Sequence, residues 1–391
     1  MMEATRSASR ESVLGNWPRY DAAVLGFRNY WYPVLFSRQL GRKPRSITLC
    51  GEKIVLVRDQ GRVYGLHDRC PHRGVPLSCG RREFPGLLTC AYHGWTYDLA
   101  TGRLEVVLTD GPDSPICGKA NVRTYPVEER AGVVWVYVGE QPPPPVEEDI
   151  PAELLQPNLT IEGFTEVRKG NWRYAAENGI DEGHSRYLHR SAFWTTFRRM
   201  PAWTQGTRMV PSEDGKWLMR ERGKAVFQDT YPRIGKWPPQ PPWRNRRGGA
   251  VYHKLGIRLP GILINTQTGW SDYEIWVPWD EDHHLAMFLA VTEATGLRAL
   301  LFRLWYRLWV RWVFYRGFNG QDQWMIEQMQ IPPERLYRPD VSITAWRKWC
   351  QEQARGAAPR AAAPTDDWAT AAAADYVAAE AATARTEVHA G

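Results

Sequence analysis

The chain has 391 residues, which is long enough for two domains with separate cores. With 43% hydrophobic and 24% charged residues and a net charge of +7, it has the composition of an ordinary soluble protein and lacks the excess of positive charge typical of nucleic-acid binders. Its six cysteines are too few for a disulfide scaffold, and its first residues contain no apolar signal segment. We therefore expect a cytoplasmic protein that binds no nucleic acid and keeps its cysteines reduced.

Residues 30–145 are expected to form an all-β domain of short strands, preceded by an N-terminal segment, residues 1–29. β-rich runs flank the turn sequence DQGR within 46–68, and a further strand in 129–140 ends in glycine. The stretch QPPPPVEEDIP at 141–151 suits neither a helix nor a central strand, because it combines a run of four consecutive prolines with an acidic run. We interpret it as a linker between domains.

Two short loops in this first domain each pair a cysteine with a histidine. CPHRG at 70–74 and CAYHGW at 90–95 provide four metal-ligand candidates, Cys70, His72, Cys90 and His93. A zinc finger usually takes its cysteines from one loop and its histidines from a helix, whereas here each loop mixes the two. This order suits a dinuclear cluster in which one iron takes both thiolates and the other both imidazoles, as in a Rieske [2Fe–2S] centre. A zinc site, or four unrelated residues, is the alternative interpretation.

The rest of the chain has a different sequence pattern, in which helices accompany the strands. Residues 146–355 are expected to form a second domain, in which a strand leads into a helix within 160–193, strands continue through 203–292, and helix dominates 297–330. The alanine-rich residues 356–391 are expected to be a disordered tail.

The sequence ENGIDEGHSRYLH in this second domain contains a pair of metal-ligand candidates, His184 and His189. Non-haem iron that activates O₂ is typically held by two histidines and one carboxylate. Residues five apart on an ideal helix point about 140° away from each other, so the helix must end or bulge between the two histidines if both bind one metal. Asp181 lies one turn before His184, where its carboxylate can fix the tautomer of that imidazole. By contrast, PWDEDHHLAMF reads as a solvent-exposed turn, so we expect His283 and His284 not to be ligands.

Because both groups of candidate metal ligands are present, residues 26–350 resemble the Rieske non-haem iron oxygenases. The iron motif of that family, D-x₂-H-x₄-H, begins here at Asp181. The resemblance implies that His184 and His189 bind iron with Asp322, in preference to the neighbouring carboxylate Glu327. It also implies that Asp181 is the bridge that carries an electron from one subunit to the next. Neither cysteine–histidine loop has the additional cysteine of the respiratory-chain Rieske proteins, which favours the oxygenase branch.

Within that family, four stretches look like the carbazole 1,9a-dioxygenase branch: residues 25–34, 177–181, 317–324 and 345–349. This resemblance implies a homotrimer in which one chain's cluster lies beside the next chain's iron. It further implies that Gly179 offers a carbonyl to a substrate N–H, that Phe318 forms an apolar wall, and that Asn178 lies just behind the ligands. The chain departs from the branch in its histidine spacing, five residues instead of four, and in the composition of 297–316.

The expected fold is therefore α+β, an all-β Rieske domain followed by a catalytic domain with a central antiparallel sheet flanked by helices. The expected function is the terminal oxygenase component of a ring-hydroxylating dioxygenase, with a [2Fe–2S] cluster and a mononuclear Fe(II), acting with O₂ on a polycyclic or heteroaromatic substrate. Electrons would come from NAD(P)H through a ferredoxin or a reductase, since the chain has no G-x-G-x-x-G fingerprint. A Rieske monooxygenase that dealkylates or hydroxylates a large substrate such as a steroid is the alternative. A ferredoxin-like electron carrier with a single metal centre is the hypothesis from another class.

The segment 297–316 combines arginines at regular spacing with leucine, tryptophan and phenylalanine. Charges recur too often for a bilayer span of about 20 apolar residues. Three interpretations remain open. The segment is a helix buried over the active site with its arginines toward water or acidic neighbours, a helix lying on a membrane surface, or a mobile lid.

Overall fold

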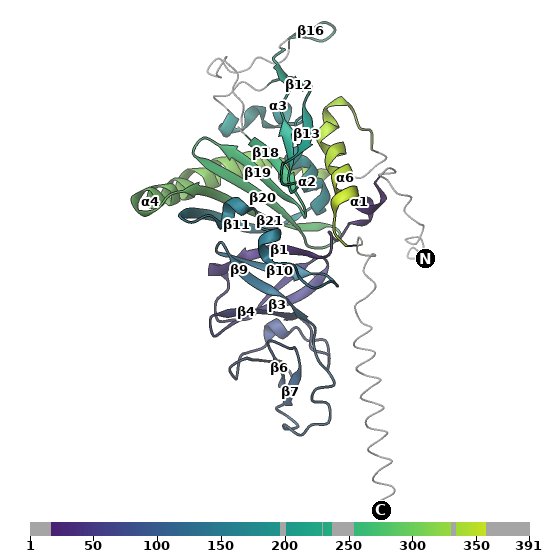
Figure 1. The fold of residues 1–391 in the computed structure, drawn as a ribbon, viewed down its shortest axis with the longest axis vertical. Coiled ribbons are helices and arrows are strands. Elements are labelled where there is room, and N and C mark those ends of the chain that lie inside the picture. Colours follow the sequence, from purple (N-terminus) through teal and green to yellow (C-terminus); the bar gives the residue numbers. More distant parts are fainter. Residues whose placement is uncertain (1–16, 196–200, 229, 237–253, 330–333, 357–391) are drawn as a thin grey trace, which may run out of the picture. The chain divides into compact units, whose positions relative to one another are not determined.

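The computed structural model describes residues 17–195, 201–228, 230–236, 254–329 and 334–356, which form two compact units (Figure 1). One unit comprises residues 28–150. The other combines residues 17–27 with the described residues that follow position 150. The predicted tail lies outside the described residues, apart from Gly356. Among the described helices, none is both long and apolar enough to cross a membrane.

The unit of residues 28–150 is built from short antiparallel strands in three sheets, with strand orders β1-β10-β9, β2-β3-β4-β8 and β5-β6-β7. Its strands are β1 (Tyr30–Phe36), β2 (Arg45–Leu49), β3 (Glu52–Asp59), β4 (Arg62–His67), β5 (Leu87–Thr89), β6 (Trp95–Asp98), β7 (Leu104–Val107), β8 (Thr124–Tyr125), β9 (Val127–Arg130) and β10 (Val133–Val138). β10 is rich in β-branched residues and is buried along its whole length, as a central strand requires. The predicted turn joins β3 to β4, because Gln60 and Gly61 both adopt the positive φ of a tight hairpin.

The other unit is organised around a seven-stranded antiparallel sheet of order β11-β21-β20-β19-β18-β14-β13. Its strands are β11 (Leu159–Lys169), β13 (Arg208–Pro211), β14 (Leu218–Glu221), β18 (Lys254–Arg258), β19 (Ile262–Gln267), β20 (Trp270–Pro278) and β21 (His283–Glu293). Two small ribbons accompany it, formed by β12 (Trp203–Gln205) with β15 (Lys224–Val226) and by β16 (Thr230–Tyr231) with β17 (Gly235–Lys236). The sheet and its helices confirm the predicted α+β fold.

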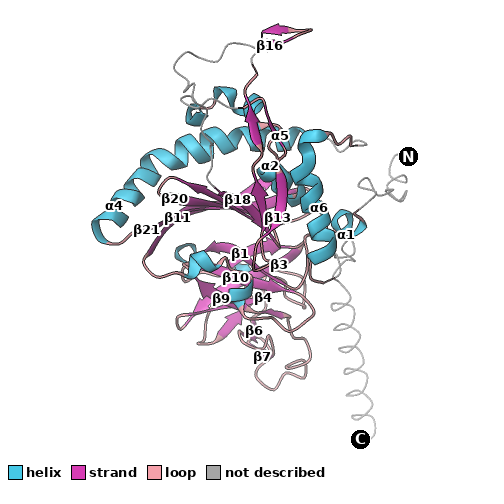
Figure 2. Cartoon of the chain, turned by 45° about the horizontal axis from the view of Figure 1, so that its top comes forward, coloured by secondary structure: helices cyan, strands magenta, loops and turns pink. Residues whose placement is uncertain are grey.

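Helices pack against this sheet (Figure 2). They are α1 (Pro18–Ala22), α2 (Trp172–Ile180), α3 (Ser185–Leu188), α4 (Gly296–Trp305), the π-helix η7 (Tyr306–Phe318), α5 (Asn319–Gln328) and α6 (Val341–Gln353). Short 3₁₀ turns are η1 (Ser37–Gln39), η2 (Leu77–Cys79), η3 (Val146–Glu148), η4 (Ala152–Leu155), η5 (His189–Ser191), η6 (Phe193–Thr195) and η8 (Arg338–Asp340). α2 lies over β19 and β20, and its first turn is capped by Asn171, whose side chain accepts the amide of Arg173.

The prediction that His284 lies in a solvent-exposed turn is wrong. His283 and His284 begin strand β21, where alternate side chains point to opposite faces, so that His283 is partly exposed while His284 is 1% exposed. Nδ1 of His284 lies 2.7 Å from the carbonyl oxygen of Gly170, and burial lowers the pKa of this ring to about 4 even though that hydrogen bond acts in the opposite direction. His284 is therefore a buried, neutral imidazole.

The expectation that residues 297–316 are buried holds for one side of the helix only. The buried side chains of this segment are Ala299, Tyr306, Val310, Phe314 and Tyr315. Several leucines and tryptophans between them are exposed. The same interpretation places the arginines toward water or acidic neighbours. This holds for Arg316, whose guanidinium lies 2.8 Å from the carboxylate of Glu166 on β11.

Candidate metal centres

The two cysteine–histidine loops have the same backbone geometry. In each loop the glycine amide donates back to the cysteine carbonyl, from Gly74 to Cys70 over 2.8 Å and from Gly94 to Cys90 over 3.2 Å. Both glycines have positive φ, +71° and +66°, which side chains other than glycine rarely adopt. The chain thus folds CPHRG and CAYHG into two matching turns, one after β4 and one between β5 and β6.

These turns bring the four predicted cluster ligands together. The rings of His72 and His93 are 4.4 Å apart, and both cysteines are buried. A hydrogen bond between the two thiols lowers the pKa of Cys90 to about 6 and raises that of Cys70. Nδ1 of His93 is buried without a hydrogen-bond partner. An orphaned imidazole nitrogen beside two thiols in contact fits a cluster held by two cysteines and two histidines.

Aromatic side chains surround these four residues. The ring of Trp95 stacks on that of His72, with 4.9 Å between centroids and 2° between planes. The hydroxyl of Tyr97, a fully buried residue, lies 3.4 Å from Sγ of Cys70. Sequence reasoning missed Tyr97, although strand alternation in β6 places it on the same face as Trp95.

The remaining cysteines lie apart from this group. Cys79 is exposed, Cys117 is half-buried, and Cys50 and Cys350 are buried, all as free thiols. Burial raises the pKa of Cys50 to about 12, so this thiol stays protonated. We find no ligand role for them among the described residues.

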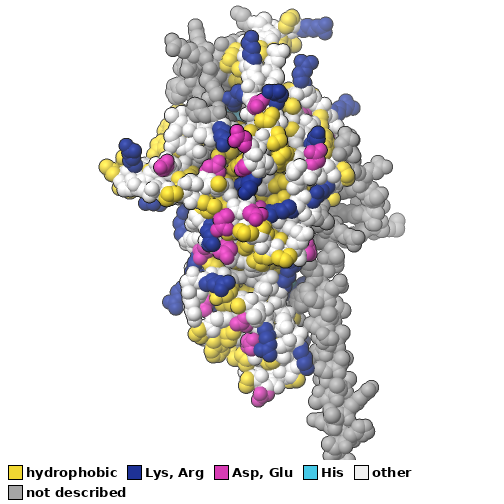
Figure 3. All heavy atoms as spheres, in the orientation of Figure 1, with side chains coloured by type: hydrophobic (Ala, Val, Ile, Leu, Met, Phe, Trp, Pro, Cys, Tyr) yellow, Lys and Arg dark blue, Asp and Glu magenta, His cyan; other side chains and the backbone are white. Residues whose placement is uncertain are grey.

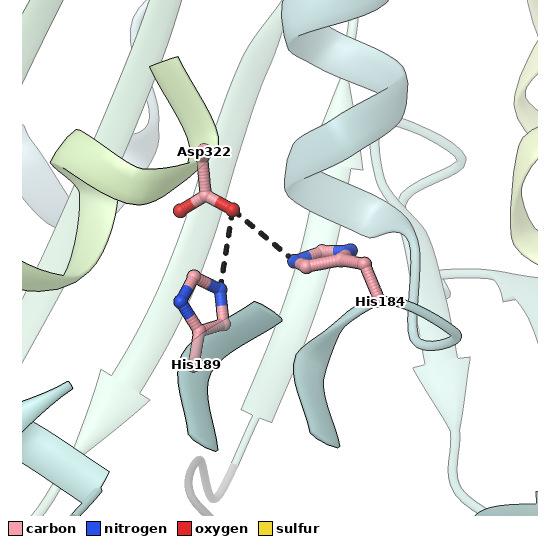
Figure 4. Close-up of side chains that lie close together, drawn as sticks. All are labelled: His184, His189 and Asp322. Carbon is pink, nitrogen blue, oxygen red and sulfur yellow. Dashed lines mark ion pairs between the residues drawn. The ribbon is translucent and has the colours of Figure 1, made fainter. Parts of the chain in front are cut away.

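The second predicted centre is assembled from two distant segments, as Figure 4 shows. α2 ends at Ile180, and a one-turn helix, α3, separates His184 from His189. The backbone changes to a 3₁₀ turn at His189, which is the break that the five-residue spacing requires. Asp322 comes from the first turn of α5.

In this centre, two imidazole nitrogens face one carboxylate oxygen. Oδ1 of Asp322 lies 3.3 Å from Nε2 of His184 and 3.1 Å from Nε2 of His189, and ligand atoms of the three residues lie within 4.8 Å of one another (Figure 4). Nevertheless, Nε2 of His189 and Oδ1 of Asp322 are buried without the geometry of a hydrogen bond. Two histidines and one carboxylate with orphaned atoms turned toward one point fit a non-haem ferrous ion.

The electrostatics of this centre also favour a cation. Burial would lower the pKa of His184, but Asp181 and Asp322 outweigh it and raise this pKa to about 10. Burial would raise the pKa of Asp322, but the close approach and the charges of the two histidines hold it well below its usual range. The three side chains thus stabilise positive charge between them, carried by a proton when no metal ion is bound.

The outer nitrogen of each histidine has its own partner. Nδ1 of His184 lies 2.9 Å from Oδ2 of Asp181, as the sequence predicted, and Nδ1 of His189 lies 3.1 Å from Oε1 of Gln321. These contacts turn each Nε2 toward Asp322. Gln321 was not predicted, because no sequence motif marks an amide beside a carboxylate. Phe318 stacks on the ring of His189, with 3.8 Å between centroids.

A cavity adjoins the three side chains. It is lined from α2 by Asn178 and Gly179, from the sheet by Leu263 and Trp276, and from the helix side by Phe318. A methyl group on Gly179 would meet the ring of Trp276 at 2.1 Å, so only glycine fits at this position. Asn178 lies at the cavity, and its carbonyl oxygen accepts the amide of Asp181.

The backbone carbonyl of Gly179 differs from those of its neighbours in its hydrogen bonding. The carbonyls of Glu177 and Asn178 accept the amide of Asp181, and the carbonyl of Ile180 accepts the guanidinium of Arg220. Gly179 lies between them, in the last turn of α2, where carbonyls lack partners within the helix. Among the described residues, no donor outside α2 contacts its oxygen.

Two acids, the buried Asp272 and the half-buried Glu274, lie on the sheet at this cavity. Asp272 and Glu274 are two residues apart on β20, so their side chains share a face. Tyr315 donates to Asp272 over 2.6 Å, and the amide of Asn319 donates to Glu274 over 2.8 Å. Burial raises the pKa of Glu274 to about 7 and that of Asp272 well above its usual value. Sequence reasoning missed this pair, since acids that alternate along a strand usually face water.

Comparison with known proteins gives consistent matches along the chain. The family described as homotrimeric ring hydroxylase matches residues 137–358, and the Rieske [2Fe-2S] domain family matches residues 30–126. The terminal oxygenase component of carbazole 1,9a-dioxygenase from Metapseudomonas resinovorans is 33% identical over 373 residues, which cover 87% of this chain and 94% of the relative.

Solved structures agree with this match. The terminal oxygenase of carbazole 1,9a-dioxygenase from Novosphingobium sp. KA1 is 30% identical, with a TM-score of 0.79 over 88% of this chain and 97% of that one. The reduced complex between oxygenase and ferredoxin in carbazole 1,9a-dioxygenase is also 30% identical, with a TM-score of 0.77 over 88% and 93% of the two chains.

Proposed function

The chain belongs to the homotrimeric ring hydroxylases that carry a Rieske [2Fe–2S] domain, and from this premise we propose which of its residues hold the two metal centres. It is the terminal oxygenase of a Rieske aromatic ring-hydroxylating dioxygenase, with a [2Fe–2S] cluster and a mononuclear non-haem iron as cofactors. The cluster ligands are Cys70, His72, Cys90 and His93, and the iron ligands are His184, His189 and Asp322. We assign residues 30–145 to the Rieske domain and 146–355 to the catalytic domain.

The observation that carries the iron assignment is the pair of buried atoms, Nε2 of His189 and Oδ1 of Asp322, that meet without forming a hydrogen bond. When bound there, ferrous iron binds and activates O₂ with electrons that the Rieske cluster supplies one at a time. The side chains of this chain prepare that chemistry. Asp181 and Gln321 hold the two imidazoles in the tautomer whose Nε2 is bare, and Phe318 covers one face of His189.

Asp181 is proposed to carry the electron between subunits. Its carboxylate contacts Nδ1 of His184 at 2.9 Å, and it also accepts the amide of Gly183 at 2.7 Å, so its position is fixed on two sides. Replacing Asp181 with Asn preserves the size of the side chain and removes its charge. We expect Asp181→Asn to keep its iron but to lose most of its turnover, and equal losses of iron and turnover would refute the bridging role.

The substrate is proposed to be a fused heteroaromatic compound with a ring N–H. Support comes from the free carbonyl of Gly179 and the apolar walls of Trp276 and Phe318, together with a relative that acts on carbazole. The cavity measures about 50 Å³, room for a few water molecules only, so a three-ring substrate enters when side chains of the wall move aside. The carbonyl then orients the ring over the iron through a single hydrogen bond.

The electron donor is proposed to be a ferredoxin reduced by NAD(P)H through a reductase, in the cytoplasm. A related oxygenase has been solved in complex with ferredoxin. Arg69, Arg73 and Arg81 are exposed beside the cluster loops and would meet an acidic partner, whereas Arg82 is engaged by Asp59.

The experiment that tests the function is turnover of a substrate panel under ¹⁸O₂ with a surrogate ferredoxin and reductase. The panel holds carbazole, dibenzofuran, naphthalene, a methoxybenzoate and a ketosteroid. Two labelled oxygens in a diol derived from carbazole support the proposal, whereas a single labelled oxygen supports the monooxygenase alternative. Iron counting tests the site independently, because about three irons per chain are expected, and His184→Ala should lose about one without altering the Rieske absorption.

A further inference from the structure

The helix formed by α4 and η7 exposes a continuous apolar stripe to solvent. Its members recur once per turn and are 46–75% exposed: Leu297, Leu301, Leu304, Leu308 and Trp312. We call these five residues the outward stripe. In Figure 3, hydrophobic side chains gather with basic ones where α4 extends from the sheet in Figure 1. Of the 22 large hydrophobic side chains exposed among the described residues, eight lie in 297–312. Such clustering marks an interaction surface.

One flank of the outward stripe carries Arg303, Arg307 and Arg311, which recur every four residues. Residues 296–318 contain five arginines and no acidic residue: Arg298, Arg303, Arg307, Arg311 and Arg316. Arg303 and Arg307 share a single acid, Glu162 of β11, at 3.7 and 3.6 Å, and their side chains remain 51% and 64% exposed. The helix therefore presents a net positive charge beside its apolar stripe.

The opposite flank is aromatic. Trp305 packs edge-on against Trp270, and Trp309 packs edge-on against Phe193, yet Trp305, Trp309 and Phe193 all remain more than one third exposed. Indole rings with one apolar side and one polar N–H favour the boundary between hydrocarbon and headgroups.

From this arrangement, we propose that α4 and η7 dock on the surface of an anionic lipid bilayer. Leucine and tryptophan enter the headgroup boundary, and the arginines lie among the negative headgroups. An anionic lipid surface suits the apolar stripe, the arginines and the tryptophans at once, because its hydrocarbon lies next to dense negative charge. In a trimer with threefold symmetry this face would meet a different surface of the neighbouring chain, so a contact with a second copy is the alternative occupant that the test below distinguishes. The proposal does not depend on the assignment of the iron ligands.

The test is flotation of the full-length holoprotein with vesicles of neutral phosphatidylcholine and of phosphatidylcholine containing phosphatidylglycerol. We expect binding to the anionic vesicles that weakens as salt increases, and little binding to the neutral ones.

A variant that combines Leu301→Gln, Leu304→Gln and Leu308→Gln should bind more weakly, by on the order of tenfold per leucine. Arg298→Gln with Arg307→Gln should weaken it by about fivefold per arginine. Failure of the unmodified protein to float with anionic vesicles overturns the proposal.

A matched control uses exposed apolar residues elsewhere, Leu155, Ile234 and Val341, each changed to Gln, and this variant should float like the unmodified protein. The iron content and Rieske absorption of every variant verify folding. Quenching of tryptophan fluorescence by brominated lipid provides a second measurement, and it should be reduced in Trp312→Phe. If instead the leucine variant converts the protein from trimer to monomer in the absence of vesicles, the stripe is a contact with a second copy and the lipid proposal is wrong.

Discussion

Nδ1 of His189 lies 3.1 Å from Oε1 of Gln321, whose sequence neighbour, Asp322, approaches the other nitrogen of the same ring at 3.1 Å. Two consecutive residues of α5 thus contact both ends of one imidazole. Because an amide oxygen only accepts hydrogen bonds, the proton of His189 must be on Nδ1, which leaves the lone pair of Nε2 directed at the proposed iron position.

Replacing Gln321 with Leu should therefore weaken iron binding without removing a ligand. We expect a 10- to 100-fold loss of iron affinity, the range typical when a partner of a metal-bound histidine is removed. Competition with a chelator, followed by iron analysis, measures this loss, while the Rieske absorption should stay unchanged. Gln328→Leu, an exposed substitution on the same helix, is the matched control. Equal affinity in the two variants would show that Gln321 does not position His189.

The hydroxyl of Tyr97 should tune the Rieske cluster, since it lies 3.4 Å from Sγ of Cys70. Reduction adds negative charge to the cluster, and a hydrogen bond to a ligand sulfur stabilises that charge. Removing the bond in Tyr97→Phe should lower the reduction potential by roughly 40 mV, for a hydrogen bond worth about 1 kcal/mol. Protein-film voltammetry measures the shift. Tyr64→Phe, in the same domain, should leave the potential unchanged, since among the described residues no hydrogen bond joins its hydroxyl to Cys70 or Cys90.

Both candidate metal centres could be proposed from the sequence because their chemistry is local. Each loop of the first centre carries its own cysteine, histidine and glycine within five residues, so the spacing alone encodes the turn. The break between His184 and His189 followed from the rotation of a helix. Asp322, by contrast, was reached only through resemblance to a family, because nothing near it in sequence indicates which sheet face α5 will cover.

What could not be predicted depends on contacts between distant segments. Asp272, Glu274 and Trp276 line or underlie the cavity because β20 is an interior strand of the sheet, which its local sequence does not reveal. His284 was misjudged for the same reason, since its acidic neighbours suggested a turn while the pairing of β21 with β20 buried the ring. The pattern of 297–316 indicated a helix, but only the structure separates its buried side from the exposed stripe.

The ion pair between Arg347 and Glu177 should be essential for placing α2. Arg347 of α6 is fully buried and contacts the carboxylate of Glu177 at 2.7 and 2.8 Å, one turn before Asp181. Arg347→Met leaves the Glu177 carboxylate buried without its cation, at a cost of about 3–5 kcal/mol in the free energy of unfolding. Urea unfolding followed by tryptophan fluorescence measures the loss.

Two further variants separate this ion pair from general effects on α6. Combining Arg347→Met with Glu177→Gln removes both charges and should recover much of the lost stability. Lys348→Met, whose side chain is 69% exposed, should change stability by less than about 1 kcal/mol. Arg347 also contacts the carboxylate of Glu334, which is partly exposed. If the double variant is no more stable than Arg347→Met, the cost comes from lost packing or from Glu334, and not from the unpaired carboxylate of Glu177.

His284 should make the stability of the catalytic unit depend on pH. Burial lowers the pKa of its ring to about 4, against about 6.5 in an unfolded chain, so between these values the unfolded chain binds a proton that the folded chain does not. The contribution of the neutral ring to the free energy of unfolding is complete above about pH 6.5 and is lost as the pH falls toward 4, reaching a loss of about 2 kcal/mol at pH 5.

His284→Gln removes this titration while its amide can still donate to the carbonyl of Gly170. The unmodified protein should therefore lose about 2 kcal/mol more than the variant between pH 7.5 and pH 5 in urea unfolding. Parallel losses in the two proteins would mean that the folded state accommodates the charged ring.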